Sequence, residues 1–505
     1  MTDQTSSKPD NGSLSKAALG GISVMGLTVG FQMTLQLLSM AILARLLTPF
    51  EFGVIAAANI VITFSNMFSD IALGSSIIQI KDITEKHIRV AFTLSVLSSV
   101  AVAAALFFSA PSLALYFDIP EIENVLMVMA TVFLWAGLST VADNLMSRSF
   151  RYKELGLIKV GGASIAFTTA VTMAWLGFSY WSIVTAMIAQ SFFCMVCLML
   201  RQKHSLIPSF HIQSLKDLLF IGGGLSFSRF VNYAALNADN FFIAKMIGTE
   251  NLGLYDRAYR LSGFPTMIFD RVASKVALSS FSRAQDDMGR MNFALRRGLS
   301  LTALLGMPVT FILVMLGPEI ILFVLGDQWH AAIAPFIILV AGMFFRLSYK
   351  VSQSVIIAVG KVYHLAVIQV IYALFVACAC YVAYPYGIDA IACAVTSAVT
   401  LNFIMLSIMA SKFTGLGFQS FMNTCISGAL MTSFVIILIV PYLYFIRPYA
   451  GPFFTLFGAG IILLTLGVVI MLKADKRVLG DHGMWLRGEI MSLLEKKIPQ
   501  ITKKF

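Results

Sequence analysis

Fourteen separate apolar segments, each long enough to cross a bilayer, run through this 505-residue chain. Crossing a hydrocarbon core of ~30 Å takes ~20 apolar residues in a helix. Only 12% of the residues are charged, whereas soluble domains average ~25%. We therefore predict an all-α polytopic membrane protein with about 14 transmembrane helices. The segments centre near residues 31, 65, 98, 135, 167, 190, 232, 267, 312, 344, 374, 398, 434 and 462.

The distribution of Lys and Arg between the turns predicts the orientation. An N-terminus placed inside puts the main basic turns in the cytoplasm and leaves Arg447 as the basic exception outside. We expect both termini in the cytoplasm. The net charge of +11 then reflects the membrane topology and favours binding to anionic lipid headgroups. We expect no nucleic-acid partner. The basic tail from Trp485 onward fits either an amphipathic helix on the inner surface or a solvated terminus.

The chain repeats itself at an offset of 200 residues, where ILARLLTPFEFGVI (42–55) matches FIAKMIGTENLGLY (242–255). Chance matches between apolar residues are common, so charged and glycine pairs in one register carry more weight. Such pairs are Lys16 and Lys216, Arg45 and Lys245, Gly53 and Gly253, and Asp70 and Asp270. Arg45 and Lys245 end apolar runs at outer helix ends, where we expect them to cap free carbonyls.

Six spans per repeat is an even number, so both repeats enter the membrane in the same direction. Transporters built from such parallel repeats bind substrate between two lobes. We predict two pseudo-symmetric six-helix lobes, residues 1–205 and 206–411. Two extra helices and a basic cytoplasmic tail follow in residues 412–505.

The segment Leu252–Ser282 carries four cations within a helical sector of about 60°. These are Arg257, Arg260, Arg271 and Lys275. Cations at membrane depth are costly unless they face water, acidic partners or an anionic cargo. Internal ion pairs and snorkelling are the alternatives, but Asp256 and Asp270 are too few to neutralise four bases. We predict cations that line a substrate cavity, with a kink at Ser262–Pro265.

Other polar side chains are expected to face the same cavity. Further cations are Arg229 in the seventh span and Arg346 and Lys350 in the tenth. The uncharged polar residues are Gln32, Gln36 and Ser39 in the first span, Asn232 and Asn240 in the seventh, and Gln353 in the tenth. The second lobe thus supplies most cations and the first lobe supplies hydrogen-bonding groups.

Three intramembrane carboxylates are candidates for ion coupling: Asp70, Asp239 and Asp270. Asp70 has no cation within one turn of its own helix. It is either a proton or sodium ligand or the ion-pair partner of a base on another span.

Signatures of catalysis, nucleotide binding and metal binding are lacking. No P-loop motif occurs, and the six histidines show no metal-ligand spacing beyond a weak His204/His211 pair. Cys194 and Cys197 form a C-x-x-C inside a span and read as small packing residues. We expect no enzymatic activity, no cofactor and no metal.

Two stretches carry a resemblance: ILARLLTPFEFGVIAAANIVITFSNMFSDIALGSSIIQ (42–79) and GPEIILFVLGDQWHAAIAPFIILVAG (317–342). They are similar to stretches of the polysaccharide-transport flippases. These are the Wzx-type members of the multidrug/oligosaccharidyl-lipid/polysaccharide exporter superfamily. The resemblance covers essentially the whole chain, including the span count and the cytoplasmic termini.

The resemblance implies a flippase in the bacterial inner membrane. Its cargo would be a polyprenyl-diphosphate-linked oligosaccharide, a precursor of capsule, exopolysaccharide or O-antigen, moved from inner to outer leaflet by alternating access coupled to H⁺ or Na⁺. Lipid, glycan polymerase and export machinery are the implied partners. Lipid flippases of the superfamily also use cavity arginines and a tail groove beside the last two spans. The first span here has Gln32 and Gln36 on its cavity face instead, so we expect the eighth span to take that role.

Three other classes stay open. A multidrug or cation antiporter of the same fold would need an acidic, aromatic cavity. A membrane glycosyltransferase, glycan polymerase or ligase would need catalytic groups in its outer loops. A non-transporting scaffold would leave the cations of Leu252–Ser282 unexplained.

Overall fold

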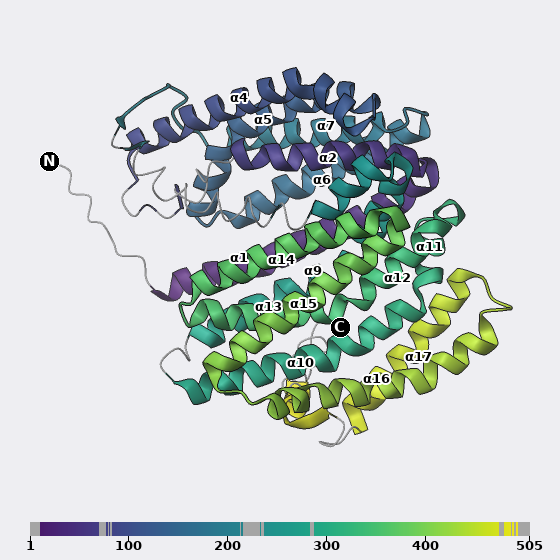
Figure 1. Ribbon diagram of the computed structural model, residues 1–505. Coiled ribbons are helices and arrows are strands. Elements are labelled where there is room, and N and C mark those ends of the chain that lie inside the picture. Colours follow the sequence, from purple (N-terminus) through teal and green to yellow (C-terminus); the bar gives the residue numbers. More distant parts are fainter. Residues whose placement is uncertain are drawn as a thin grey trace, which may run out of the picture. The chain divides into compact units, whose positions relative to one another are not determined.

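The computed structural model describes residues 11–69, 83–212, 237–282, 287–473 and 479–485, with a few isolated positions besides. Within this part, side chains are described except at 11–25, 268–282 and a few single positions. Every regular element in these ranges is a helix (Figure 1). The prediction of an all-α membrane protein is confirmed.

Twelve helices in the described ranges are long and apolar enough to cross a membrane. They correspond to the predicted spans one to six and nine to fourteen. Most of the seventh span lies outside the described residues, and the eighth is α9 (Thr249–Ser282), whose charges make it too polar for this criterion. The count is therefore compatible with fourteen spans.

The chain divides into two compact units, Met1–Gly253 and Leu254–Phe505. The first unit continues beyond residue 205, where the repeat predicts the end of the first lobe, because segment 237–253 packs on α2 and α4. The lobe boundaries at 205/206 and 411/412 stay a prediction.

The first unit is a bundle of long helices. These are α1 (Asn11–Leu46), α2 (Pro49–Ser69), α4 (Glu85–Phe117), α5 (Glu121–Arg148), α6 (Tyr152–Trp175) and α7 (Trp181–Arg201). α4 packs along α5, α6 along α7, and α1 against α6 (Figure 1). Cys194 and Cys197 pack against an apolar cluster around Met146, as expected for packing residues, and all six cysteines are free.

The second unit contains the rest of α9 and the remaining helices. These are α10 (Met288–Met315), α11 (Gly317–Val324), η1 (Asp327–Ala332), α12 (Ile333–Ala341), α13 (Met343–Ala358), α14 (Val362–Ala383), η2 (Tyr384–Tyr386), α15 (Ile388–Thr414), α16 (Phe418–Ile446) and α17 (Pro452–Lys473). The predicted tenth span is thus several short helices in series. α16 packs along α10, α15 along α13 and α14, and α17 against α11 (Figure 1).

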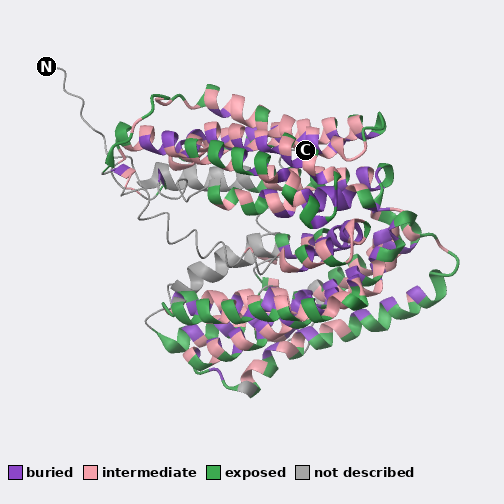
Figure 2. Cartoon of the chain, turned by 45° about the horizontal axis from the view of Figure 1, so that its top comes forward, coloured by how far each residue is buried: buried purple, intermediate pink, exposed green. Residues whose placement is uncertain are grey.

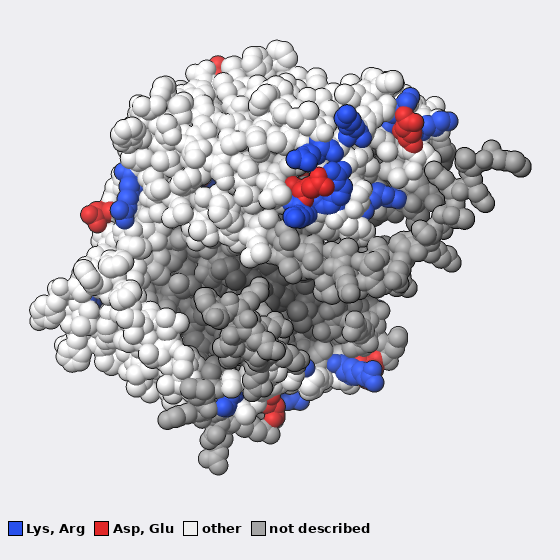
Figure 3. Space-filling view, turned by 180° about the vertical axis from the view of Figure 1, so that it is seen from behind, with Lys and Arg blue, Asp and Glu red and all other residues white. Residues whose placement is uncertain are grey.

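Large apolar side chains remain on the surface of both units, as a membrane-embedded protein requires. Leu115 is 82% exposed, Phe108 79% and Trp175 78%. Exposed residues alternate with buried ones along most helices in Figure 2. Among the described residues in Figure 3, charged side chains gather in a few groups, most of which include both signs, and most of the remaining surface of these residues is uncharged. A wide apolar surface of this kind matches the hydrocarbon solvent.

Arg447, the basic exception on the predicted outer side, is held by an ion pair. Its Nε donates to Glu319 Oε1 at 2.5 Å, and its Nη2 donates to Glu319 Oε2 at 3.0 Å and to the Met315 carbonyl at 2.7 Å. Glu319 is only 5% exposed. The pair joins the end of α16 to α11 and neutralises the charge that departs from the topology pattern.

The tail segment 479–485 packs on α10 in the second unit. The guanidinium of Arg297 lies 3.2 Å from the ring centroid of Trp485, and Phe293 meets His482 edge-to-face at 5.3 Å. Burial and the nearby charges of Arg297 and Arg296 lower the pKa of His482 below its ordinary value. The start of the tail is therefore docked on α10, and most of the residues after Trp485 lie outside the description.

Candidate functional site

Asp256 organises the first cations of α9. Its Oδ2 accepts from Arg257 Nη2 at 2.6 Å, and Arg260 Nε lies 2.9 Å from both carboxylate oxygens. Asp256 is 4% exposed and Arg257 8%, whereas the side chain of Arg260 is 42% exposed. The ion-pair alternative thus accounts for Arg257, which faces Asp256. Arg260 keeps its two Nη groups without a hydrogen bond to any described residue.

Arg346 supplies a third guanidinium from α13. Its Cζ lies 5.3 Å from the ring centroid of Tyr259 on α9, within the range of a cation–π contact. Tyr255 stacks on Tyr259 with 6.1 Å between centroids, and Tyr349 and Tyr372 also lie close enough to interact with the charge. Among the described residues, no carboxylate pairs with this guanidinium.

The cluster is cationic overall. Three guanidinium groups and one carboxylate leave two net positive charges inside the second unit. Asp256 lies about 10 Å along α9 from Thr249, at ~1.5 Å per residue, so the group lies inside the helix and not at its end. Guanidinium groups with free N–H donors bind phosphate oxygens in a fork geometry. Tyrosine rings and hydroxyls offer apolar faces and hydrogen bonds beside them.

Helix α9 keeps this arrangement despite Pro265. It runs unbroken from Thr249 to Ser282, so the chain stays helical through Ser262–Pro265, where the kink stays a prediction. The hydroxyl of Ser262 donates to the Tyr259 carbonyl at 2.8 Å, and that of Thr266 donates to the Gly263 carbonyl at 2.7 Å. Each hydroxyl thus bonds the carbonyl three residues earlier on the same helix, so both polar side chains are satisfied locally beside the proline.

The structure describes only some of the other residues predicted for the cavity of the second lobe. Lys350 and Gln353 lie on α13 with Arg346 and are half-buried. Arg271, Lys275 and Asp270 lie on α9, but their side chains are outside the description. Arg229 and Asn232 of this lobe, like Asp70 of the first lobe, lie outside the described residues altogether. Their roles in the cavity or in ion coupling stay predictions.

The first unit holds the predicted residues of the first lobe on α1, and also Asp239 and Asn240, which were predicted for the second lobe. On α1, Gln32 and Ser39 are half-buried and Gln36 is exposed. Asp239 is 2% exposed and accepts a hydrogen bond from the backbone N–H of Asn240 at 2.8 Å. The side-chain oxygen of Asn240 is buried and has no hydrogen-bond partner among the described residues. This unit therefore offers amide and hydroxyl groups and one buried carboxylate.

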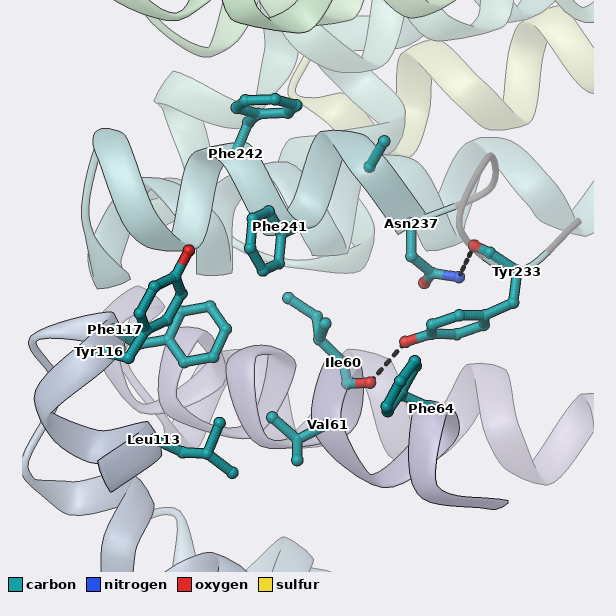
Figure 4. Close-up of a pocket in the computed structure, with 11 residues that line it drawn as sticks. Ile60, Val61, Phe64, Leu113, Tyr116, Phe117, Tyr233, Asn237, Phe241 and Phe242 are labelled. Atoms are coloured by element: carbon teal, nitrogen blue, oxygen red, sulfur yellow. Dashed lines mark hydrogen bonds between the residues drawn. The ribbon is translucent and has the colours of Figure 1, made fainter. Parts of the chain in front are cut away.

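The first unit contains an aromatic pocket that the sequence pattern did not predict. Its volume is about 440 Å³, and it lies between α2, the end of α4 and segment 237–246 (Figure 4). Its aromatic lining is Phe64, Tyr116, Phe117, Tyr233, Phe241 and Phe242. These residues come from stretches far apart in the sequence, so no local motif marks the pocket.

Metal binding finds no support in the described ranges, where no group of three His, Cys, Asp or Glu residues could hold an ion. Lys245, expected to cap a free carbonyl, donates to the Tyr116 carbonyl at the end of α4 at 2.5 Å. It caps a neighbouring helix rather than its own.

Residues 42–334 match the family model described as "Polysaccharide biosynthesis protein". The chain belongs to this family. The expected membership in the polysaccharide-transport branch of the exporter superfamily is thereby confirmed. The prediction of a multi-pass membrane protein of polysaccharide biosynthesis is confirmed as well.

Curated relatives agree with this family. Teichuronic acid biosynthesis protein TuaB of Bacillus subtilis (strain 168) is 24% identical over 355 residues, 69% of this chain and 71% of that protein. Lipopolysaccharide biosynthesis protein WzxC of Escherichia coli (strain K12) is 21% identical, over 64% of this chain and 66% of that protein. Succinoglycan biosynthesis transport protein ExoT of Rhizobium meliloti (strain 1021) is 25% identical, over 62% and 63%. The last two matches span slightly less than two thirds of those relatives.

Solved structures show the same fold. Lipid II flippase MurJ, in an inward closed conformation, superposes with a TM-score of 0.72 at 14% identity, over 88% of this chain and 98% of that one. An inward-facing multidrug resistance MATE family transporter gives 0.61 at 12% identity, over 76% and 96%. At these identities the likeness concerns the fold alone.

Proposed function

We propose that this protein moves a polyprenyl-diphosphate-linked oligosaccharide from the inner to the outer leaflet of a bacterial cytoplasmic membrane. The observation that carries the proposal is the cationic cluster of Asp256, Arg257, Arg260 and Arg346 inside a membrane-spanning bundle. The cargo is a precursor of capsule, exopolysaccharide or O-antigen. Membrane lipids and a glycan polymerase or export machinery are its partners, and both termini lie in the cytoplasm.

The free-energy cost of placing these charged side chains at membrane depth supports an anionic cargo. An ionised side chain at membrane depth costs several kcal/mol on insertion scales, and Asp256 offsets only part of three such charges. A diphosphate carries about two negative charges at neutral pH, which matches the two positive charges left over. The Nη groups of Arg260 and the guanidinium of Arg346 are the donors available to it.

The glycan part of the cargo requires hydrogen-bonding groups in place of cations. Sugar hydroxyls pair with amides and hydroxyls, and Gln32, Gln36 and Ser39 supply these on α1. Alternating access of two lobes would bring the diphosphate and glycan groups to each leaflet in turn.

Ion coupling with H⁺ or Na⁺ is part of the proposal. Asp239 is its best-described candidate, because a carboxylate that is 2% exposed in a span would change the preferred state of the lobes on binding a cation. Asp70 and Asp270 keep the same proposed role.

A cation antiporter of the same fold is the second candidate, since MATE transporters share the architecture. The net positive charge around Arg346 would repel an organic cation. Among the described residues of the cluster, Asp256 is the carboxylate present, and two arginines already engage it. The geometry therefore favours the anionic cargo.

Deletion followed by lipid analysis tests the function. Cells without the protein should accumulate the lipid-linked oligosaccharide with its glycan protected from an impermeant periplasmic glycosidase. Arg346→Gln should reproduce most of that accumulation, with transport reduced about tenfold or more, as expected for a lost charge-assisted hydrogen bond. Arg346→Lys should retain more transport.

Arg290→Gln is the matched control, because the side chain of Arg290 is 76% exposed and, among the described residues, forms an ion pair with the surface residue Asp287 alone. It should transport normally. Wild-type surface glycan in the deletion strain, with no lipid-linked intermediate accumulated, would refute the proposal.

A further inference from the structure

The aromatic pocket of the first unit is not used by the groups assigned above to the diphosphate and the glycan. We propose that it binds the isoprenoid chain of the polyprenyl-diphosphate cargo, with Lys245 at its rim binding the diphosphate. The identity of the cargo rests on the proposed function. The pocket itself rests on its own geometry, and it is separate from α16 and α17, where the family resemblance places the lipid tail.

The pocket is built to hold hydrocarbon and exclude water. The hydroxyl of Tyr233 donates to the Ile60 carbonyl at 2.5 Å, and the amide of Asn237 donates to the Tyr233 carbonyl at 3.1 Å (Figure 4). These polar groups of the lining are thus satisfied within the protein, and the rest of the wall is apolar. An apolar cavity without free polar groups stays dry and accepts apolar ligands.

Aromatic rings shape the wall. Phe64 lies 6.3 Å from Tyr233, and Phe241 lies 5.7 Å from Phe117 and 6.1 Å from Tyr116, measured between ring centroids. Figure 4 shows the rings of α2 and α4 opposite Phe241 of segment 237–246, with the apolar side chains of Leu113 and Val61 on the α2 and α4 side. A chain with planar double bonds and methyl branches fits between such ring faces and edges.

A cation stands at one end of the pocket. Lys245 Nζ lies 4.9 Å from the ring centroid of Tyr116 and donates to the carbonyl of that residue. An ammonium group has three donors, and Lys245 makes no other hydrogen bond to the described residues. It follows Phe241 by one helical turn, so the charge lies just beyond the apolar wall. An apolar pocket with a cation at its mouth complements an apolar chain that ends in a phosphate.

The volume of the pocket and its position along the spans favour the binding of one hydrocarbon chain. Its volume of about 440 Å³ is near the lower end of the ~300–1,000 Å³ range of ligand pockets. This suits one hydrocarbon chain better than the pair that a phospholipid carries. Tyr116, Phe241 and Lys245 lie at the predicted outer ends of their spans, which is the side to which a flippase delivers its cargo. The pocket would hold the chain as the diphosphate reaches the outer surface.

Photolabelling of the purified full-length protein in lipid nanodiscs tests the pocket. The probe is a polyprenyl diphosphate with a diazirine in its chain, and the comparison probe is phosphatidylglycerol with a diazirine in one acyl chain. We expect the prenyl probe to label peptides that contain Phe64 and Phe241. Unlabelled polyprenyl diphosphate should compete, and phosphatidylglycerol should not.

Four variants make the test more specific. Ala238→Trp fills the pocket and should reduce labelling about tenfold or more, whereas Leu115→Trp, on the exposed face of α4, should not change it. Lys245→Gln should weaken competition by polyprenyl diphosphate about tenfold, the effect of one lost charge-assisted hydrogen bond, and Lys245→Arg should preserve it. Gel-filtration profiles confirm that each variant is folded.

Two outcomes would overturn the pocket assignment. Equal labelling by phosphatidylglycerol, with mutual competition, would mean that bulk lipid occupies the pocket. Absence of label from both peptides would mean that no chain binds there. Accumulation of lipid-linked glycan in the deletion strain is measured independently, so flipping can be shown while the pocket fails. Prenyl labelling without any glycan phenotype would instead retain the pocket and refute the proposed function.

Discussion

Gly53 and Gly253, which the sequence repeat pairs at an offset of 200 residues, meet at one helix crossing within the first compact unit. A Cβ on Gly53 would lie 1.9 Å from the carbonyl oxygen of Thr249, and one on Gly253 would lie 1.8 Å from that of Pro49. Pro49 and Thr249 are themselves repeat mates. The contact between α2 and the start of α9 is therefore reciprocal, as in a two-fold interface.

Alanine at either glycine should destabilise the protein. The clashing atoms are backbone carbonyls, which cannot rotate away, so the helices must separate at a cost of about 1–3 kcal/mol or more. Gly460→Ala on α17 is the control, because a Cβ there meets nothing within 4 Å. Thermal unfolding in detergent should show a lower Tm for Gly53→Ala and Gly253→Ala and an unchanged or higher Tm for Gly460→Ala. Equal Tm values for all three would contradict the close approach.

Asp256 should be essential for the fold of α9. Asp256→Asn would leave the guanidinium of Arg257, which is 8% exposed, as an uncompensated buried charge. Breaking such a pair costs about 3–5 kcal/mol. The double variant with Arg257→Met should recover much of that loss, and titration with denaturing detergent measures both. A double variant no more stable than Asp256→Asn alone would show that the two residues are not coupled.

Charge should matter more than bulk at Arg260. Arg260→Lys keeps a cation near Asp256 but loses the fork of donors, so glycan export should fall only partly. Arg260→Gln keeps a polar side chain that can donate hydrogen bonds but removes the charge, and export should fall further at similar protein levels. Surface glycan quantified in the deletion strain provides the measurement. Full export by both variants would make the charge purely structural.

Docking of the tail on α10 should depend on pH through His482. Its pKa is lowered in the docked state by burial and by Arg297 and Arg296, with Asp481 opposing them. A released tail has the ordinary histidine pKa of about 6.5 and binds the proton more readily. Docking is therefore strongest above that pH and weakens as the pH falls through it toward the lowered pKa.

Quenching of Trp485 fluorescence checks this dependence in a variant whose other four tryptophans are replaced by phenylalanine. A soluble quencher should reach Trp485 more readily at pH 5.5 than at pH 7.5. His482→Gln should remove the difference, because the group that titrates is gone. A pH effect that persists in His482→Gln would assign it to another residue.

The sequence predicts the features that depend on local pattern. Apolar length gives the spans, and the basic turns give the orientation that makes Arg447 stand out. The repeat pairs Gly53 with Gly253 but does not reveal that they touch. That contact depends on how α2 and α9 cross, which no periodicity encodes.

The candidate site was predictable in its residue types and less so in its pairings. A helical wheel places Arg257 and Arg260 on one face, yet the side chain of Arg257 is 10% exposed and that of Arg260 42%, although both bond the carboxylate of Asp256. Arg346 gains its aromatic partner from Tyr259, 87 positions earlier in the sequence. The pocket around Phe241 was missed because apolar residues in a span look alike whether they line a cavity or face lipid.

The ion pair of Glu319 and Arg447 also implies an order of folding events during synthesis of the chain. The two residues are 128 positions apart, so at ~5–20 residues per second the carboxylate is synthesised roughly 6 to 26 seconds before its partner. During that interval Glu319 lies in the nascent second unit without the cation that compensates its burial. The unit can therefore reach its final stability only after α16 has crossed the membrane. A helix outside the repeat thus completes the folding of the lobe that precedes it.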